Sequence, residues 1–233
     1  MSNKQQTRDV DMRVIIVDCI STAESYCPIT LTPEFSNKNY TVIESKPSPL
    51  NSAEIDVRVR SSNGVYEMYK EYIGDGLQRV YITLLTTNYS SINVRIGAEN
   101  YTVKKVHYVN TSLVPLYRLL EDNLSVTYVD ASEWDISQVS AFSSTFKNCK
   151  NLETIVGIEN WDMSNVTYMQ DTFYNCSKLT SLDLSNWRFN SLIELSNTFY
   201  GCTSLTSIGN IKRWNARKIE NIILKMYEGK GLF

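Results

Sequence analysis

Histidine is the residue best suited to acid–base chemistry near neutral pH, and this chain has very little of it. His107 is the single histidine among 233 residues. A Ser-His-Asp or Cys-His site would have to use this residue, and one residue cannot define such a geometry. A structural or surface role is favoured for His107. We therefore expect no catalytic residues of this kind and a non-enzymatic protein.

The cysteines have a spacing that suits packing better than metal binding. Cys149, Cys176 and Cys202 are widely and almost evenly spaced, with no Cys-x-x-Cys pair and no second histidine to complete a zinc site. Three thiols at one phase of a repeat are typical of buried side chains in a stack. We predict free structural thiols and no metal.

Two other groups contain residue types that occur at catalytic or cofactor sites. Asp130, Glu133 and Asp135 surround Trp134, and a carboxylate pair could serve a glycosidase or hold calcium. Their spacing fits neither motif, which favours a solvated loop. Gly74-Asp75-Gly76 lacks the third glycine and the following helix of a dinucleotide loop, so we expect a hairpin turn there. No cofactor is predicted.

An internal repeat, almost constant in length, determines which elements position these groups. Tryptophan recurs at four positions, and three of these are followed at fixed offsets by phenylalanine and cysteine. The structural repeat residues are Trp134, Phe146, Cys149, Trp161, Phe173, Cys176, Trp187, Phe199, Cys202 and Trp214. Such self-similarity predicts stacked units, each of which buries its apolar face against its neighbours.

The middle of each unit has the spacing of a short helix. Apolar residues occur at offsets 0, 3 and 7, as in Val166, Met169 and Phe173, and these offsets lie on one helical face. Ser164 stands two residues ahead of that face, where a side-chain oxygen can cap the first turn. Ser137 and Asn190 take the same position in the neighbouring units.

The end of each unit has the pattern of a short strand. Polar residues alternate with leucines at residues 181–184, which predicts one buried and one exposed side. The exposed positions of this strand in two units, Tyr128, Asp130, Ser181 and Asp183, are our candidate binding face. In the longer units the strand contains a glycine, such as Gly157, which we expect to permit a bulge or tight bend.

The repeat template extends beyond its tryptophans. Shifted back by one unit, it places Tyr108 at the tryptophan position, so we predict five units with atypical outer ones. Their bounds are 108–133, 134–160, 161–186, 187–213 and 214–233. The predicted fold is therefore an N-terminal all-β sandwich or barrel, residues 1–107, followed by a short leucine-rich-repeat solenoid, residues 108–233, with a strand and a short helix per unit.

The N-terminal region follows a period of two. Apolar residues alternate with charged ones in short segments such as residues 55–60, and turn-prone clusters separate these segments. We predict about eight strands. A domain of this kind ahead of a repeat array is expected to attach the protein to an oligomer or larger assembly.

The repeat units resemble the BspA-like class of bacterial surface-protein leucine-rich repeats. The best copy of that pattern runs from Trp161-Asp162-Met163-Ser164-Asn165-Val166 through Phe173, Cys176, Leu179, Leu182 and Leu184. The likeness covers roughly residues 108–233. Members of this family are mostly exported adhesins and related interaction proteins of bacteria and some parasites, so the resemblance implies binding rather than catalysis.

Charge and hydropathy restrict the partners and the location. The net charge is only −2, which gives no overall field to attract nucleic acid, so we expect no nucleic-acid partner. The first apolar run, residues 14–17, is too short for a secretory signal or a membrane span. We expect a protein without a signal peptide or a membrane span, in a virion or the host cytoplasm.

Three functions fit these observations. The favoured one is a structural or recognition protein whose repeats bind a protein or a surface carbohydrate, for example a bacteriophage head or tail fibre component. The alternative is a bacterial cell-surface adhesin. A carbohydrate-active enzyme using the carboxylates near Trp134 is the third.

Overall fold

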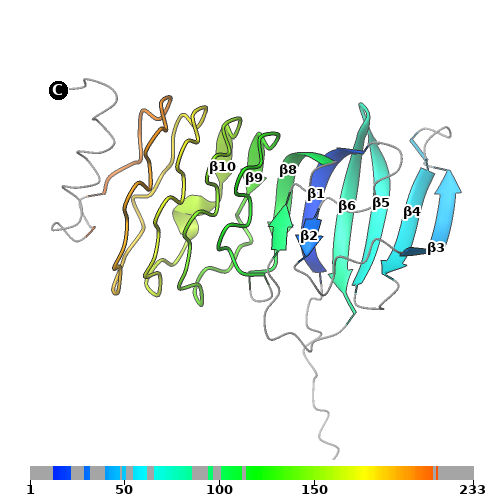
Figure 1. The fold of residues 1–233 in the computed structure, drawn as a ribbon, viewed down its shortest axis with the longest axis horizontal. Coiled ribbons are helices and arrows are strands. Elements are labelled where there is room, and N and C mark those ends of the chain that lie inside the picture. The colour runs from blue at the N-terminus through cyan, green and yellow to red at the C-terminus, as the bar shows by residue number, and fades with distance from the viewer. Residues whose placement is uncertain are drawn as a thin grey trace, which may run out of the picture.

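The computed structural model describes residues 13–21, 29–31, 40–47, 49–50, 55–61, 66–85, 94–96, 101–111, 114–211 and 214. A sheet of long strands lies beside a stack of short coils (Figure 1). Each coil corresponds to one repeat unit, and the coils are numbered in the order of the units, so that the first coil is residues 108–133. Within the predicted unit 214–233, everything after Trp214 lies outside the described residues.

The strands expected before the repeats are present. They are β1 (Arg13–Ser21), β2 (Ile29–Leu31), β3 (Tyr40–Pro47), β4 (Ile55–Ser61), β5 (Tyr66–Gly74), β6 (Leu77–Leu84), β7 (Val94–Ile96) and β8 (Tyr101–Val109). The prediction of about eight strands is confirmed for the described part of the chain. Gly74, Asp75 and Gly76 all have positive φ between β5 and β6, so the expected hairpin turn is also confirmed.

The strands form one open sheet rather than a barrel. Its order is β10-β9-β8-β1-β6-β5-β4-β3, with β9 (Tyr128–Asp130) and β10 (Thr154–Val156) contributed by the repeats. A separate two-stranded sheet joins β2 and β7. The pairs from β3 to β8 are antiparallel, whereas β8–β9 and β9–β10 are parallel. The all-β prediction holds for the described residues. Of its two alternatives, sandwich or barrel, the barrel is wrong for the described strands, because the sheet does not close on itself.

Alternation sorts the side chains of the sheet onto two faces. Val17 and Val80 pair across β1 and β6 and are fully buried, whereas their neighbours Asp18 and Arg79 pair on the opposite face. The buried face joins the interior of the coil stack in a single hydrophobic core. The opposite face, which we call the outer face, carries the ion pair of Asp18 and Arg79.

The coils stack in register, so equivalent residues form columns. Trp134, Trp161, Trp187 and Trp214 have neighbouring ring centroids 5.8, 6.0 and 6.0 Å apart. The phenylalanines at 146, 173 and 199 stack at 5.4 and 5.6 Å. All of these rings are buried. The columns confirm that the spacing of the repeat places equivalent side chains in contact.

The predicted short helix of each unit is absent from the described residues, where turns take its place. Two residues per coil have positive φ, which an α-helix does not allow; in the third coil they are Asp171 and Asn175. Alternate N–H groups of this segment donate to the next coil, for example Phe173 N to Thr198 O at 2.9 Å. The only described helical segment is the 3₁₀ turn η2 (Ile158–Asn160).

The caps expected for those helices are also wrong. Ser137 and Ser164 do not accept a helix N–H; instead their own backbone N–H groups donate to Asp135 Oδ1 and Asp162 Oδ1, each at 3.0 Å. These are local side-chain turns within a loop. Asn190, which is also among the described residues, makes no capping bond to a helix N–H.

Gly157 permits the bend that the sequence predicts. Its φ is +83°, and a Cβ there would lie 2.3 Å from the Cα of Ser132 in the preceding coil. Only glycine allows both the backbone conformation and this close approach. The extra residue of the longer unit is thus accommodated at the start of η2.

Candidate binding surface

The four residues predicted as a binding face lie at equivalent positions of the strand segments. Tyr128 and Asp130 flank the buried Val129 in β9, and Ser181 and Asp183 flank the buried Leu182 two coils further on. We call the side formed by Tyr128, Asp130, Ser181 and Asp183 the strand face. β10 pairs with β9 in parallel register and continues this face between them.

Asp130 and Asp183 are fixed in orientation by their own loops. Asp130 Oδ1 accepts the N–H of Ser132, and Asp183 Oδ1 accepts that of Ser185, each at 3.0 Å. The hydrogen bonds from the hydroxyl and the N–H of Ser185 lower the pKa of Asp183. The strand face therefore presents preorganised carboxylates at its edge.

Tyr128 connects the strand face to the outer face of the sheet. Its ring centroid lies 6.5 Å from that of His107, and Lys105 Nζ lies 5.9 Å from the Tyr128 ring. Burial and the nearby Asp130 carboxylate raise the pKa of the Tyr128 phenol, which therefore stays protonated at neutral pH. The two surfaces meet at this tyrosine.

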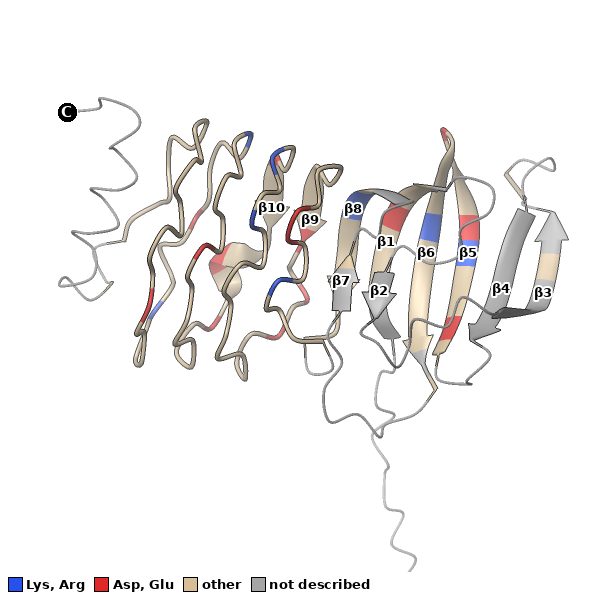
Figure 2. Ribbon diagram, in the orientation of Figure 1, with Lys and Arg blue, Asp and Glu red and all other residues tan. Residues whose placement is uncertain are grey.

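The centre of the outer face is a buried ion-pair cluster. Asp18 is only 2% exposed, and it accepts hydrogen bonds from Arg79 Nε at 2.7 Å and from His107 Nε2 at 2.7 Å. Figure 2 shows the acidic segment of β1 beside the basic segment of β6 in the middle of the sheet. A carboxylate can only accept here, so Nε2 of His107 carries the hydrogen.

The pKa of Asp18 reflects opposing effects. Burial disfavours the charged carboxylate and raises its pKa, but the hydrogen bonds and charges of His107 and Arg79 outweigh it and lower the pKa from 3.8 to about 2. Asp18 is therefore ionised throughout the physiological range. His107 therefore has a structural role, as the sequence favours, because it hydrogen-bonds the buried Asp18 carboxylate. The sequence did not show this partner.

Asp18 and Arg79 were not candidate residues in the sequence. Asp18 interrupts an apolar run, residues 14–17 followed by 19–20, in which an acidic side chain is costly unless paired. That interruption was the available signal. The partner could not be read from it, because Arg79 is 61 residues away and only the strand register brings the two together.

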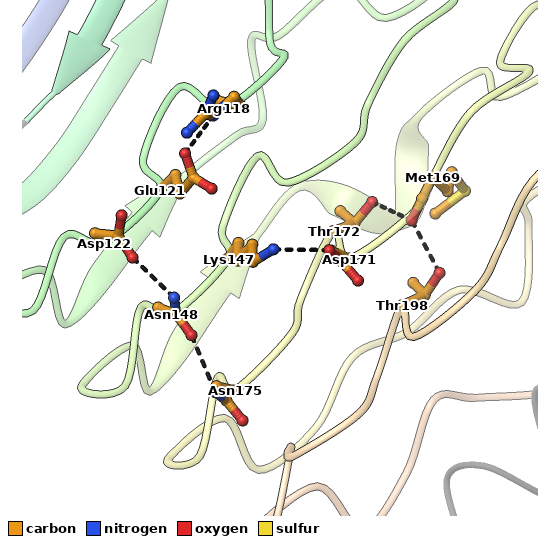
Figure 3. A network of polar contacts seen from close by, with 10 residues as sticks. All are labelled: Arg118, Glu121, Asp122, Lys147, Asn148, Met169, Asp171, Thr172, Asn175 and Thr198. Atoms are coloured by element: carbon orange, nitrogen blue, oxygen red, sulfur yellow. Dashed lines mark hydrogen bonds and ion pairs between the residues drawn. The ribbon is translucent and has the colours of Figure 1, made fainter.

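A second polar surface runs along the turns of the coils. We call it the turn edge and define it by Arg118, Glu121, Lys147, Asp171 and Tyr174. Arg118 pairs with Glu121, and Lys147 Nζ lies 2.8 Å from Asp171 Oδ2 (Figure 3). The hydrogen bond from Lys147 to Asp171 is the main cause of the raised pKa of Lys147. These opposite charges form paired contacts rather than a patch of one sign.

An amide ladder accompanies the turn edge. Asn148 Nδ2 donates to Asp122 Oδ1 at 2.8 Å, and Asn175 Nδ2 donates to Asn148 Oδ1 at 3.0 Å (Figure 3). These residues also have positive φ, as does Gly201 at the equivalent position. Asn, Asp and Gly are the residues that tolerate this backbone conformation. Their recurrence just before the cysteine column was a readable sign of turns instead of helices.

The cysteine column consists of buried thiols that form no disulfide. Cys149, Cys176 and Cys202 donate to the carbonyl oxygens of Leu120, Phe146 and Phe173 in the preceding coil at 3.0, 3.1 and 3.0 Å. Burial raises the pKa of the Cys149 and Cys176 thiols, so neither is a reactive thiolate at neutral pH.

The described part of the chain contains no group of three His, Cys, Asp or Glu side chains placed to hold a metal ion. Nor does any helix among those residues have the length and apolar character needed to cross a membrane.

Comparison with known proteins assigns the repeats to a family. The family model described as "Mycoplasma protein of unknown function, DUF285" matches residues 115–232, slightly more than half of the chain. No curated protein and no solved structure matches the sequence. The match starts within the first predicted unit and covers the tryptophan, phenylalanine and cysteine columns.

Proposed function

Because this chain belongs to the family described as Mycoplasma proteins of unknown function, DUF285, we propose that it is a non-enzymatic recognition protein. Its repeats form a leucine-rich-repeat solenoid of the BspA-like class, and the solenoid presents the strand face to a protein or a surface carbohydrate. The family description assigns no activity, so the proposal depends on the surface itself.

The observation that carries the proposal is the contrast between the two sides of each strand segment. The inward residues, such as Val129 and Leu182, form apolar columns that only hold the stack together. The outward residues change from a tyrosine in one coil to a serine in another, at the same phase. A fixed core with a freely varying outer side is the arrangement by which repeat proteins build binding surfaces.

The chemistry of the strand face suits polar recognition. Tyr128 offers a large amphipathic ring of the kind enriched at interfaces, and Asp130 and Asp183 offer oriented acceptors. Lys105 adds a cationic donor beside the tyrosine. Hydroxyl-rich glycans and polar protein loops both present groups that fit such a set.

The binding experiment uses the full chain on an array of immobilised extracellular-matrix proteins and cell-surface glycans. We expect at least one specific ligand for the wild type, and a loss of about tenfold or more in affinity for Tyr128→Ala combined with Asp183→Ala. Gln170→Ala is the control, because Gln170 is exposed, precedes Asp171 of the turn edge and is not one of the strand-face residues. Unchanged binding by the double variant, or no specific ligand on the array, would count against the strand face as the recognition surface.

Two settings for this protein are proposed. A virion component, such as a bacteriophage head or tail fibre, would be folded in the host cytoplasm and displayed after lysis. A bacterial cell-surface adhesin is the second candidate, and the match to a family named for Mycoplasma proteins supports it. Antibodies against the chain distinguish them, since they would label purified virions in the first case and intact cells in the second.

A third proposal, a carbohydrate-active enzyme, is tested separately. Asp135 Oδ1 accepts the N–H of Ser137, and hydrogen bonds from the hydroxyl and the N–H of Ser137 lower the pKa of Asp135. A general acid requires the opposite shift. We expect no glycoside hydrolysis by the wild type, and loss of a measured activity in Asp130→Asn or Asp135→Asn would instead support the enzyme.

A further inference from the structure

Two backbone contacts recur between consecutive coils and define their register. The N–H of the residue in the phenylalanine column donates to the next coil, as Phe146 N does to Thr172 O at 2.9 Å. The carbonyl oxygen of the same residue accepts the thiol of the next cysteine, as Phe146 O does from Cys176 at 3.1 Å. Leu120 makes both contacts in the first coil, with Thr145 and Cys149.

Ile96, the last residue of β7, makes the same pair of contacts although it lies ahead of the predicted array. Its N–H donates to Leu119 O at 2.8 Å, and its carbonyl oxygen accepts Nδ2 of Asn123 at 3.1 Å. Leu119 and Asn123 occupy the columns of Thr145 and Cys149. Ile96 is also buried, as the phenylalanine column is.

Strand β8 supplies the corresponding strand contacts. Lys104 O accepts the N–H of Thr127 at 3.0 Å, just as Thr180 O accepts the N–H of Thr206 at 2.9 Å between later coils. Val106 pairs with Val129 in a parallel ladder. One contact is missing: the buried Nε1 of Trp134 has no acceptor, whereas Trp161 Nε1 donates to Ala131 O at 3.2 Å.

We propose that β7 and β8 together form a further, degenerate unit that caps the N-terminal end of the repeat array. The spacing from Ile96 to Leu120 is shorter than the repeat, so the periodicity of the sequence does not reveal this unit. The far side of β8 pairs with β1, so the cap belongs to both the array and the N-terminal sheet. The sheet and the coils then open and fold as one cooperative unit.

Asn123 is the residue that locks this cap. It replaces cysteine in its column and is 4% exposed. While Nδ2 reaches Ile96, Oδ1 accepts the N–H groups of Ser125 and Val126, both at 3.0 Å. Ser125 Oγ donates to Val103 O in β8 at 2.9 Å, so one short segment holds both strands of the cap.

The test is amide hydrogen exchange of the full-length chain. Asn123→Ala should speed exchange at Ile96, at Thr127 and along β8 by about tenfold or more. The carbonyl oxygen of Ile96 loses its donor in this variant, and the N–H of Val126 loses its acceptor. Asn123→Cys should be milder than Asn123→Ala, since a thiol can still donate to the Ile96 carbonyl as Cys149 does to that of Leu120. Asn165→Ala is the matched control: its Nδ2 also donates to a carbonyl of the preceding coil, Ser137 O at 2.6 Å, but on the exposed surface.

Ser125→Ala keeps the test decisive if Asn123→Ala does not fold, because it removes only a hydroxyl, 2.9 Å from Val103 O and 3.0 Å from Asn123 Oδ1, and leaves the bond from Asn123 to Ile96 in place. We expect smaller increases in exchange at the same amides. The proposal is overturned if β8 exchanges at the wild-type rate in these variants while the first coil opens. It is also overturned if Asn165→Ala loosens β8 equally, or if Asn123→Cys is no milder than Asn123→Ala.

Discussion

Among single residues, Asp18 depends most on its surroundings, because a buried carboxylate is tolerated only with partners. Its pKa is 3.8 in the unfolded chain and about 2 in the folded one. Between these values the unfolded state binds more protons, so stability rises with pH there. The contribution, about 2 kcal/mol, is complete above pH 3.8 and is lost as the pH falls through 2.

This linkage predicts how Asp18→Asn behaves. At pH 7 the variant should be less stable than the wild type, because Arg79 and His107 lose a charged acceptor. The difference should shrink as the pH is lowered from 4 to 2. Urea denaturation at a series of pH values measures it, and a difference that stays constant below pH 4 would contradict the ionised cluster.

The burial of the cysteine column predicts low reactivity of its thiols. Cys149, Cys176 and Cys202 are buried and donate to carbonyls, so native protein should resist alkylation by iodoacetamide at neutral pH. Urea should expose all three. Peptide mapping by mass spectrometry reports each site, and rapid native labelling of Cys176 would show that the stack is open.

At this scale the sequence predicts columns but not ion pairs. The tryptophans, phenylalanines and cysteines repeat at an almost fixed spacing, and a stack converts such spacing directly into contact. Asp18 and Arg79 do not repeat, and their contact depends on how β1 pairs with β6. Strand register is set by the hydrophobic pattern and the turns of the whole sheet, so the pairing of two residues 61 positions apart cannot be read from either residue alone.

At the scale of the element, the repeated turn depends on positive φ at two positions per coil. Gly201 takes the second of these, and a Cβ there would lie 2.1 Å from Asn175 Oδ1. Gly201→Ala should therefore destabilise the fold by about 1–3 kcal/mol, from backbone strain and this close contact. Denaturant titration measures the loss.

A double-mutant cycle separates the two causes. Asn175→Gly removes the atom that the new Cβ would meet, so Gly201→Ala should cost less in that background, leaving mainly the backbone term. Equal costs in both backgrounds would mean that crowding by Asn175 is not part of the penalty.

The phenylalanine column is one of the two buried aromatic columns of the stack. Phe173 is fully buried and stacked against Phe146 and Phe199, so Phe173→Ala should cost about 3–5 kcal/mol. Tyr200→Ala is the comparison, because Tyr200 is 52% exposed and should cost much less. Thermal or urea unfolding tests the ranking, and similar costs would show that burial does not rank these positions.

The predicted helices failed at this scale for a physical reason. Apolar offsets of 0, 3 and 7 place side chains on one side of a helix, but a turn with two positive-φ residues can bury the same positions. In that turn alternate N–H groups leave the coil and bond to its neighbour. The sequence sign that distinguishes this turn from a helix is a residue that tolerates positive φ at the same position of each coil. These residues are Asp122, Asn148, Asn175 and Gly201.

At the scale of the whole molecule, the sequence divides the chain near residue 108, whereas hydrogen bonds cross that position without a break. The change from period two to the much longer internal repeat is real, and it marks a change in local structure. Pairing of β8 with β1 on one side and β9 on the other joins the two patterns in one sheet. A boundary in pattern is therefore not a boundary in hydrogen bonding.

This continuity predicts that the repeats do not fold well without the strands before them. A fragment of residues 108–233 loses the strand that pairs with β9 and exposes Val126 and Val129, both fully buried in the full chain. We expect it to aggregate or to melt without a cooperative transition, while the full chain shows a single one. Circular dichroism and light scattering compare the two. A monomeric fragment with the full chain's transition would show that the array stands alone and that the N-terminal sheet is a separate domain.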